Sequence, residues 1–324
     1  MGSHFGVGED ITSFERTYDV IVGLGFLALA LVAAKRMNGS RDVGGSETTV
    51  VTAFYSLILI TASLRAIWFL IPNSVWQPTY TPTAVMAFDT TTPWFGTFAS
   101  EAMLTAGSLA LFAIFILILV YWADILKKYF YPGARRSRPM MTFAILIATL
   151  ISLEFLNALF FLLRAYSSEG MILFNAILLS SVSLICVVEI TIFSHRFRTV
   201  LKTLGAINQV STESQVQRIV WITVTGNVFF FTRALLEMLF AILLISYWSH
   251  YGSVQRVFSH SLWDVYVYVK HTSEVAILCL MLYILQSRFT TNAAAGYQSV
   301  PDAETSASTV PATSNAPSIS AIVV

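Results

Sequence analysis

Charged residues are scarce in this chain. Asp, Glu, Lys and Arg together make up 11% of its 324 residues, whereas 56% of the residues are hydrophobic. Soluble domains usually carry about 25% charged residues, so this composition excludes an ordinary soluble protein. The net charge is only +1, but the few charges are sorted by position along the chain, as described below.

Cysteine and histidine are scarce as well. The two cysteines, Cys186 and Cys279, both lie inside apolar runs, where a thiol packs as a small apolar group and forms no disulfide across outer loops. The five histidines lack the tight spacing of a zinc site, and no Ser-His-acid or Cys-His arrangement stands out. We therefore expect no enzyme activity, no metal and no cofactor.

Long hydrophobic runs are what the chain has in abundance. Each run is about 18 residues or longer, which is enough for a helix to cross a hydrocarbon core about 30 Å thick. The sequence thus predicts an all-α, polytopic membrane protein with seven transmembrane helices. The runs are Thr17–Ala34, Thr48–Leu70, Phe98–Tyr121, Met140–Leu163, Gly170–Phe193, Ile219–Tyr247 and Val265–Leu285.

The basic residues between these runs alternate between the two sides of the membrane. Thirteen lysines and arginines follow the first, third, fifth and seventh runs, and three (Arg16, Arg164 and Arg256) lie on the opposite side. Cytosolic loops carry an excess of Lys and Arg, so we expect an outside or luminal N-terminus and a cytosolic C-terminus. The predicted organisation is a short luminal segment (1–16), a transmembrane domain (17–288) and a tail (289–324) whose Ser, Thr, Ala and Pro content predicts disorder.

Six of the charged residues inside the predicted spans lie near the midplane or in the outer half of the membrane. An unpaired charge at the centre of a bilayer costs roughly 2.5 kcal/mol or more, so these residues should face inward and pair with one another. One interpretation is a structural ion-pair network that orients the helices. The other is a polar cavity that binds a small charged ligand or passes protons. The six residues are Arg65, Glu154, Arg233, Glu237, Lys270 and Glu274.

Two kinds of seven-helix protein are disfavoured by what the runs contain. The third run ends Tyr121-Trp122-Ala123-Asp124 rather than in the acidic-arginine-aromatic triplet of rhodopsin-like receptors, and the last two runs contain no proline. A retinal Schiff base on Lys270 is disfavoured because Asp264 precedes it by six residues rather than by one helical turn. A ligand-sensing receptor of another class stays open as an alternative, as does a proton or small-ion pathway.

Four short segments resemble the tobamovirus multiplication protein family of plants, which has orphan-receptor-like relatives in animal lysosomes. Tyr121, Trp122, Ala123, Asp124 and Ile125 are similar to the aromatic-Trp-Ala-acidic-Ile signature of that family. The resemblance extends to Arg65 followed by a small residue, to Arg233, and to Glu274 followed by an aliphatic run, and it covers about residues 17 to 288.

The resemblance implies a non-enzymatic endomembrane protein of vacuolar or lysosomal type. Such a protein would work in trafficking or membrane organisation with an Arf-like small GTPase. The candidate docking surface comprises Asp124 and the basic segments around Arg136 and Arg198, which would meet the acidic face of a GTPase. The plasma membrane is the alternative location.

A possible sorting signal follows the seventh run. Tyr297-Gln298-Ser299-Val300 has the tyrosine-x-x-bulky pattern that clathrin adaptors bind as an added extended strand, with pockets for Tyr297 and Val300. The expected partners are therefore the lipid bilayer, an Arf-like GTPase and a clathrin adaptor. No nucleic-acid partner is expected.

Overall fold

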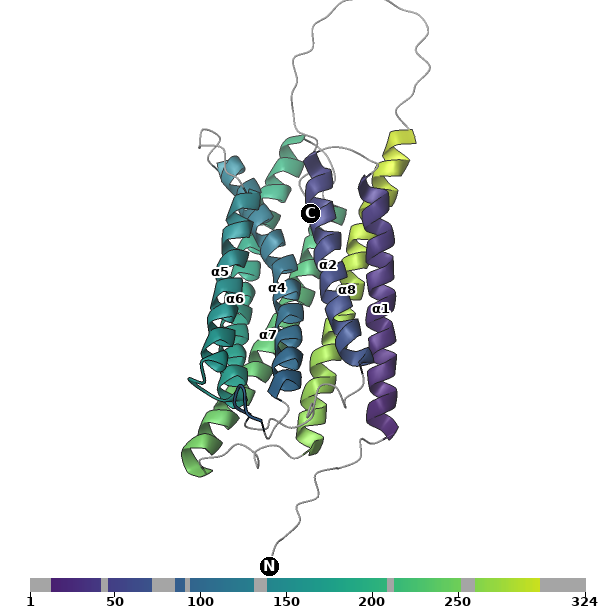
Figure 1. Cartoon of the computed structure of the whole chain (residues 1–324). Coiled ribbons are helices and arrows are strands. Elements are labelled where there is room, and N and C mark those ends of the chain that lie inside the picture. The colour runs from purple at the N-terminus through teal and green to yellow at the C-terminus, as the bar shows by residue number, and fades with distance from the viewer. Residues whose placement is uncertain are drawn as a thin grey trace, which may run out of the picture.

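Seven long helices make up nearly all of the described chain (Figure 1). The computed structural model describes residues 13–41, 46–71, 85–90, 94–130, 139–208, 213–251 and 260–297, and no strand occurs among them. The helices are α1 (Ser13–Arg41), α2 (Ser46–Leu70), α4 (Trp94–Phe130), α5 (Pro139–Leu162), α6 (Ser168–Asn208), α7 (Glu213–Tyr251) and α8 (His260–Tyr297).

All seven helices are long and apolar enough to span a bilayer, which confirms the predicted number of spans and the all-helical class. Several helices run beyond the predicted apolar runs. α4 begins at Trp94 rather than Phe98, and α8 continues to Tyr297, nine residues past the predicted domain end at 288. Residues 289–297 are therefore helical, contrary to the predicted disordered tail, and residues 298–324 lie outside the described chain.

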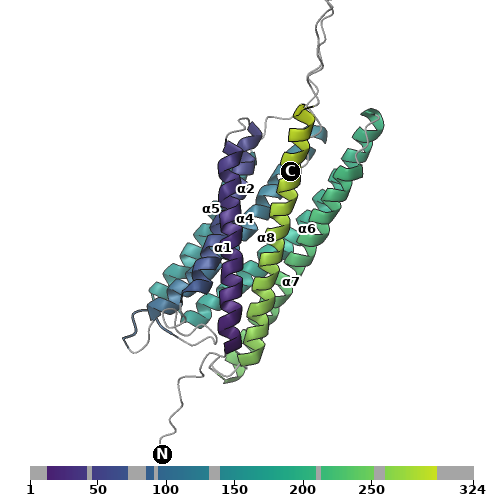
Figure 2. The ribbon, with the colours of Figure 1, turned by 90° about the vertical axis from the view of Figure 1, so that its right-hand side faces the viewer.

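The helices form a closed ring in which each one packs against the next: α1 on α2, α2 on α4, α4 on α5, α5 on α6, α6 on α7, α7 on α8, and α8 on α1. α4 also packs against α6, which gives it three neighbours. In the most apolar 18-residue stretch of α4, 67% of the residues are buried, compared with 11% in the corresponding stretch of α5. α4 is thus the core helix, whereas α5 lies at the periphery with most of its surface toward lipid. Figure 2 shows α6 and α7 leaning away from α1 and α2 as a pair.

The interior of the bundle is filled by aromatic and aliphatic side chains. Phe112 and Phe115 of α4 stack against Phe230 and Phe229 of α7, with ring centroids 4.5 to 6.2 Å apart. Large apolar side chains cover the outer faces of every helix, for example Ile21, Phe155 and Val228. In lipid this pattern exposes no apolar surface to water, so it is the arrangement expected of a membrane bundle.

A short segment, Val85–Thr90, covers the turn between α5 and α6. The backbone N–H of Val85 donates to Ser168 Oγ at 2.9 Å, and the Ser168 N–H donates to the Val85 carbonyl at 2.9 Å. Arg164 Nη2 donates to the Phe88 carbonyl at 3.1 Å, and its guanidinium lies 5.9 Å from the centre of the Phe88 ring. Phe88 and Arg164 both have positive φ angles, near 60°, which marks two tight reversals at this end of the bundle.

Candidate functional site

Glu274 of α8 is the centre of a buried ion-pair network. Arg65 of α2 binds its carboxylate with two nitrogens, Nε at 2.7 Å and Nη2 at 2.9 Å. Arg233 of α7 donates to the same carboxylate from Nη1 at 2.6 Å. Arg65 and Glu274 are fully buried and Arg233 is 2% exposed, so one carboxylate compensates two guanidinium groups away from water. Three helices are thereby joined at one point.

A second carboxylate, Glu237, extends the network along α7. Its Oε1 lies 3.1 Å from Arg233 Nε and 3.1 Å from Lys270 Nζ, and its Oε2 accepts a hydrogen bond from the Tyr266 hydroxyl at 2.9 Å. Lys270 also donates to the Tyr266 hydroxyl at 2.9 Å. The i,i+4 spacing of Arg233 and Glu237 places both side chains on one face of α7, as the sequence predicts.

The central helix α4 contributes uncharged groups to the same network. Ser108 Oγ accepts one hydrogen bond from Arg65 Nη2 and one from Arg233 Nη2, both at 2.8 Å. The Leu104 carbonyl accepts from Arg65 Nη1 at 2.8 Å. A Cβ atom on Gly107 would lie 3.1 Å from Arg65 Cζ, so glycine at this position lets the guanidinium lie against the helix backbone.

His271 completes the surroundings of Glu274. Its Nδ1 lies 3.1 Å from Glu274 Oε2, one helical turn away on α8. The imidazole packs between Trp68, at 5.7 Å between ring centroids, and Phe69, at 4.9 Å. These aromatic rings belong to α2, and Trp68 Nε1 donates to Ser100 Oγ on α4 at 2.9 Å. Aromatic side chains therefore enclose the network on this side, and His271 itself is only 2% exposed.

The structure brings five of the six predicted charged residues together and leaves the sixth apart. Arg65, Arg233, Glu237, Lys270 and Glu274 share the network, whose three cations outnumber its two carboxylates. Glu154, which we expected to balance the third cation, does not join them. Glu101 of α4, which also falls within an apolar run, interacts electrostatically with Lys270 and Glu237 of the network.

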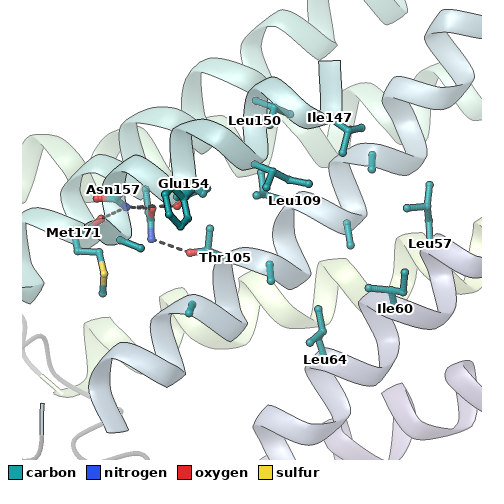
Figure 3. A pocket seen from close by; sticks show the side chains of 18 of the residues that line it. Leu57, Ile60, Leu64, Thr105, Leu109, Ile147, Leu150, Glu154, Asn157 and Met171 are labelled. Carbon is teal, nitrogen blue, oxygen red and sulfur yellow. Dashed lines mark hydrogen bonds between the residues drawn. The ribbon is translucent and has the colours of Figure 1, made fainter. Parts of the chain in front are cut away.

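Glu154 lies on α5, at the side of a separate cavity of about 500 Å³ (Figure 3). Asn157 Nδ2 is 3.5 Å from Glu154 Oε2. The side-chain amide of Asn175 is oriented so that its Nδ2 donates to Glu154 Oε2 at 2.8 Å and its Oδ1 accepts from Thr105 Oγ1. Within the described part of the chain no lysine, arginine or histidine forms an ion pair with Glu154. The expectation that all six charges pair was wrong at this residue, because α5 packs at the rim of the bundle and faces away from the network.

The aromatic-Trp-Ala-acidic segment is a packing element in this fold. The indole ring of Trp122, which is 1% exposed, stacks on Phe197 of α6 with ring centroids 5.8 Å apart. Asp124 is 6% exposed. It is therefore too buried to present a docking carboxylate, which corrects the sequence-based prediction for that residue. Tyr121 and Ala123 are half-buried beside it.

The remaining predicted site residues lie at the ends of helices. Arg198 is half-buried, and its Nε donates to the Ser194 carbonyl one turn back at 3.3 Å. Tyr297 is the last residue of α8, whereas Arg136 and Val300 lie outside the described residues. The adaptor-binding motif stays a prediction, of which the structure describes only the tyrosine, as the last residue of a helix.

Sequence reasoning missed several polar residues inside the spans. Glu101 and Glu189 both fall within apolar runs, so a complete count of charges in those runs would have found them. Ser108, Gly107, Tyr266 and His271 could not be found in that way, because serine, glycine, tyrosine and histidine are ordinary residues in membrane helices. Only the helix packing shows that they surround the network.

The comparisons with known proteins add no relative. The chain matches no protein-family model, no curated protein and no solved structure. The resemblance to the tobamovirus multiplication proteins thus rests on the short segments around Arg65, Trp122, Arg233 and Glu274.

Proposed function

We propose that this protein is a non-enzymatic endomembrane protein of vacuolar or lysosomal type that recruits an Arf-like small GTPase to its cytosolic face. Two observations support the proposal. The first is the resemblance of four segments to a family that works in this way. The second, which carries the proposal, is a basic helical projection at the end of α6, formed by residues 194–208.

The length of α6 exceeds what a bilayer needs. Its 41 residues extend about 60 Å at 1.5 Å per residue, about twice the thickness of the hydrocarbon core. The apolar run of this helix ends at Phe193, so the part that leaves the membrane is the C-terminal one, residues 194–208. The positive-inside bias assigns that end to the cytosol.

The projection is anchored on one side and exposed on the other. Phe197 and Val200 are buried, and Phe197 stacks on Trp122 at the end of α4. His195, Arg196 and Lys202 are exposed. A helix fixed by the Trp122–Phe197 stack and bearing exposed cations is suited to an acidic partner surface, and complementary charge speeds the encounter of the two proteins.

The buried network supports this proposal over an ion pathway. Within the described residues, Glu274 binds arginines of two other helices at 2.6 to 2.9 Å, and Glu237 lies 3.1 Å from Arg233 of its own helix. The guanidinium groups are further held by Ser108 and by the Leu104 carbonyl. Groups that satisfy one another in this way favour a fixed bundle that presents a surface. A ligand-sensing receptor is the second candidate, and the cavity beside Glu154 favours it.

Reversing the charge of the projection tests the proposal. The double variant Arg196→Glu/Lys202→Glu, purified in lipid nanodiscs, should lose about tenfold or more of its binding to a GTP-loaded Arf-like GTPase, because two exposed cations become anions facing an acidic surface. Binding is measured by surface plasmon resonance with GTP-loaded and GDP-loaded GTPase in parallel, and affinity capture from native membranes identifies the GTPase that binds.

Arg16→Glu is the matched control, because Arg16 is an exposed arginine at the opposite end of the bundle. It should leave GTPase binding unchanged. Equal binding by the wild type and the double variant would contradict the assignment of the surface. Capture of heterotrimeric G proteins in place of small GTPases would favour the receptor.

A further inference from the structure

The cavity beside Glu154 is apolar along its length and polar on one side. α2, α4 and α5 form most of its wall, and α6 closes one end with Met171 and Asn175. Its volume of about 500 Å³ is within the range of about 300 to 1,000 Å³ that small-molecule sites occupy. Figure 3 shows Thr105, Glu154 and Asn157 together, apart from Leu57, Ile60, Ile147 and Leu150. An amphipathic molecule would match this division.

The cavity is oriented like a lipid of one leaflet. On α4 it extends from Phe98 to Ala113, about 22 Å at 1.5 Å per residue. Its polar residues lie toward the end of the bundle where α1 begins, because Glu154 and Asn157 belong to the last turns of α5, which ends there. The apolar residues Leu57, Ala113 and Ile147 lie deeper, toward the middle of the spans. A ligand in this cavity would lie parallel to the acyl chains of the bilayer.

Small side chains on α4 make the space. Ala102, Ala106, Ala110 and Ala113 line the cavity, and they leave a channel between the larger side chains of α2 and α5. The ligand is therefore narrow along most of its length. A single unbranched chain fits this description better than a fused ring system or a two-chain lipid.

Glu154 determines the chemistry of the polar end. The amides of Asn157 and Asn175 orient its carboxylate, and the hydroxyl of Tyr166 donates to Asn157 Oδ1, which fixes that amide in turn. No described cation is paired with Glu154, in contrast to Glu237 and Glu274. A carboxylate at this depth gains stability from a counter-ion, and a carboxylate accepts hydrogen bonds rather than donating them.

We propose that this cavity binds a single-chain amphipathic amine. Its ammonium group pairs with Glu154, and its alkyl chain runs along the alanines of α4 toward the middle of the bilayer. The ammonium donates up to three hydrogen bonds, one of which reaches Glu154 and another the Thr105 hydroxyl. Glu237 and Glu274 are paired with cations of the protein itself, whereas the ligand supplies the cation for Glu154.

Photolabelling in nanodiscs of uncharged phosphatidylcholine tests the proposal, with a photoactivatable hexadecylamine as the probe. Mass spectrometry of the labelled protein should find the label on residues that line the cavity in α2, α4 and α5. Unlabelled hexadecylamine should compete, and hexadecanol should compete about tenfold less well or worse, because it offers no charge to Glu154. Equal competition by the alcohol would overturn the proposal in favour of a neutral hydroxyl-bearing lipid.

Two variants and one control locate the site. Glu154→Gln keeps the shape of the side chain and should weaken amine labelling of this cavity about tenfold. Glu189→Gln alters an exposed carboxylate that lines a different cavity and should leave labelling of this one unchanged. Ala110→Leu narrows the channel without touching the carboxylate, and it should also reduce labelling. If Glu154→Gln fails to fold, Ala110→Leu decides alone. Unchanged labelling in the folded variants would show that the amine binds elsewhere.

Discussion

Replacing Glu274 with glutamine is expected to lower the free energy of unfolding by about 3 to 5 kcal/mol. Glutamine preserves the shape of the side chain but removes its charge. Arg65 and Arg233 would then be left without the carboxylate that binds both of them, at full burial. Uncompensated charges inside a bilayer are costly, so the variant should show reduced expression and a lower unfolding midpoint in detergent or bicelles.

The matched control for this prediction is Glu189→Gln. Glu189 lies in a membrane span as Glu274 does, but its side chain is exposed rather than buried. The same chemical change should therefore leave the unfolding midpoint within a degree or two of the wild type. A Glu274→Gln variant as stable as this control would show that the two arginines have no need of the carboxylate.

The second large effect is expected at Gly107. Leucine at this position should destabilise the protein by about 3 kcal/mol, because its Cβ alone would lie 3.1 Å from Cζ of Arg65 and would push the guanidinium away from Glu274. Alanine should cost about 1 kcal/mol, since the guanidinium need then give by only a few tenths of an ångström. Equilibrium unfolding in bicelles measures both variants.

Gly25 provides the control for Gly107. It is also a glycine within an apolar span, but no atom outside its own helix lies within 4 Å of a Cβ built there. Gly25→Leu should therefore leave stability unchanged or raise it slightly, since leucine has the higher helix propensity. If Gly25→Leu and Gly107→Leu had equal effects on the free energy of unfolding, the close approach of Arg65 to α4 would not contribute to stability.

The fold could be predicted from the sequence because its determinants are local. A run of about 20 apolar residues suffices to predict a spanning helix, and each of the seven runs stands by itself. The ends of helices were less predictable: α8 runs through residues 289–297, where the Ser, Thr and Ala content favoured disorder. Composition reflects the cost of ordering a segment in isolation. It does not include the lower cost of adding residues to the end of a helix that has already formed.

The network could be predicted only in part, for a different reason. The cost of a buried charge is local, so the sequence alone indicates that Arg65, Arg233 and Glu274 need partners. Which partner each one finds depends on helix packing. The i,i+4 pair of α7 follows from spacing, whereas the assignment of Glu154 to this network was wrong, since nothing in the sequence shows that α5 lies at the rim.

The roles of uncharged residues were hidden for the same reason. Ser108 accepts from both arginines, yet a serine in an apolar run ordinarily bonds to its own helix, as Ser108 also does with the Leu104 carbonyl at 3.1 Å. Trp122 belongs to the segment that resembles a known signature, and the structure gives it a packing partner, Phe197, which the motif itself does not indicate.

A double-mutant cycle on Arg65 and Glu274 tests most directly the central claim that these buried charges hold the helices in register. The cycle compares the free energies of unfolding of Arg65→Gln, Glu274→Gln and the double variant in bicelles. The double variant keeps the net charge of the wild-type network, so its loss should be smaller than the sum of the two single losses by about 2 kcal/mol. Additive losses, equal to the sum within about 0.5 kcal/mol, would contradict the claim.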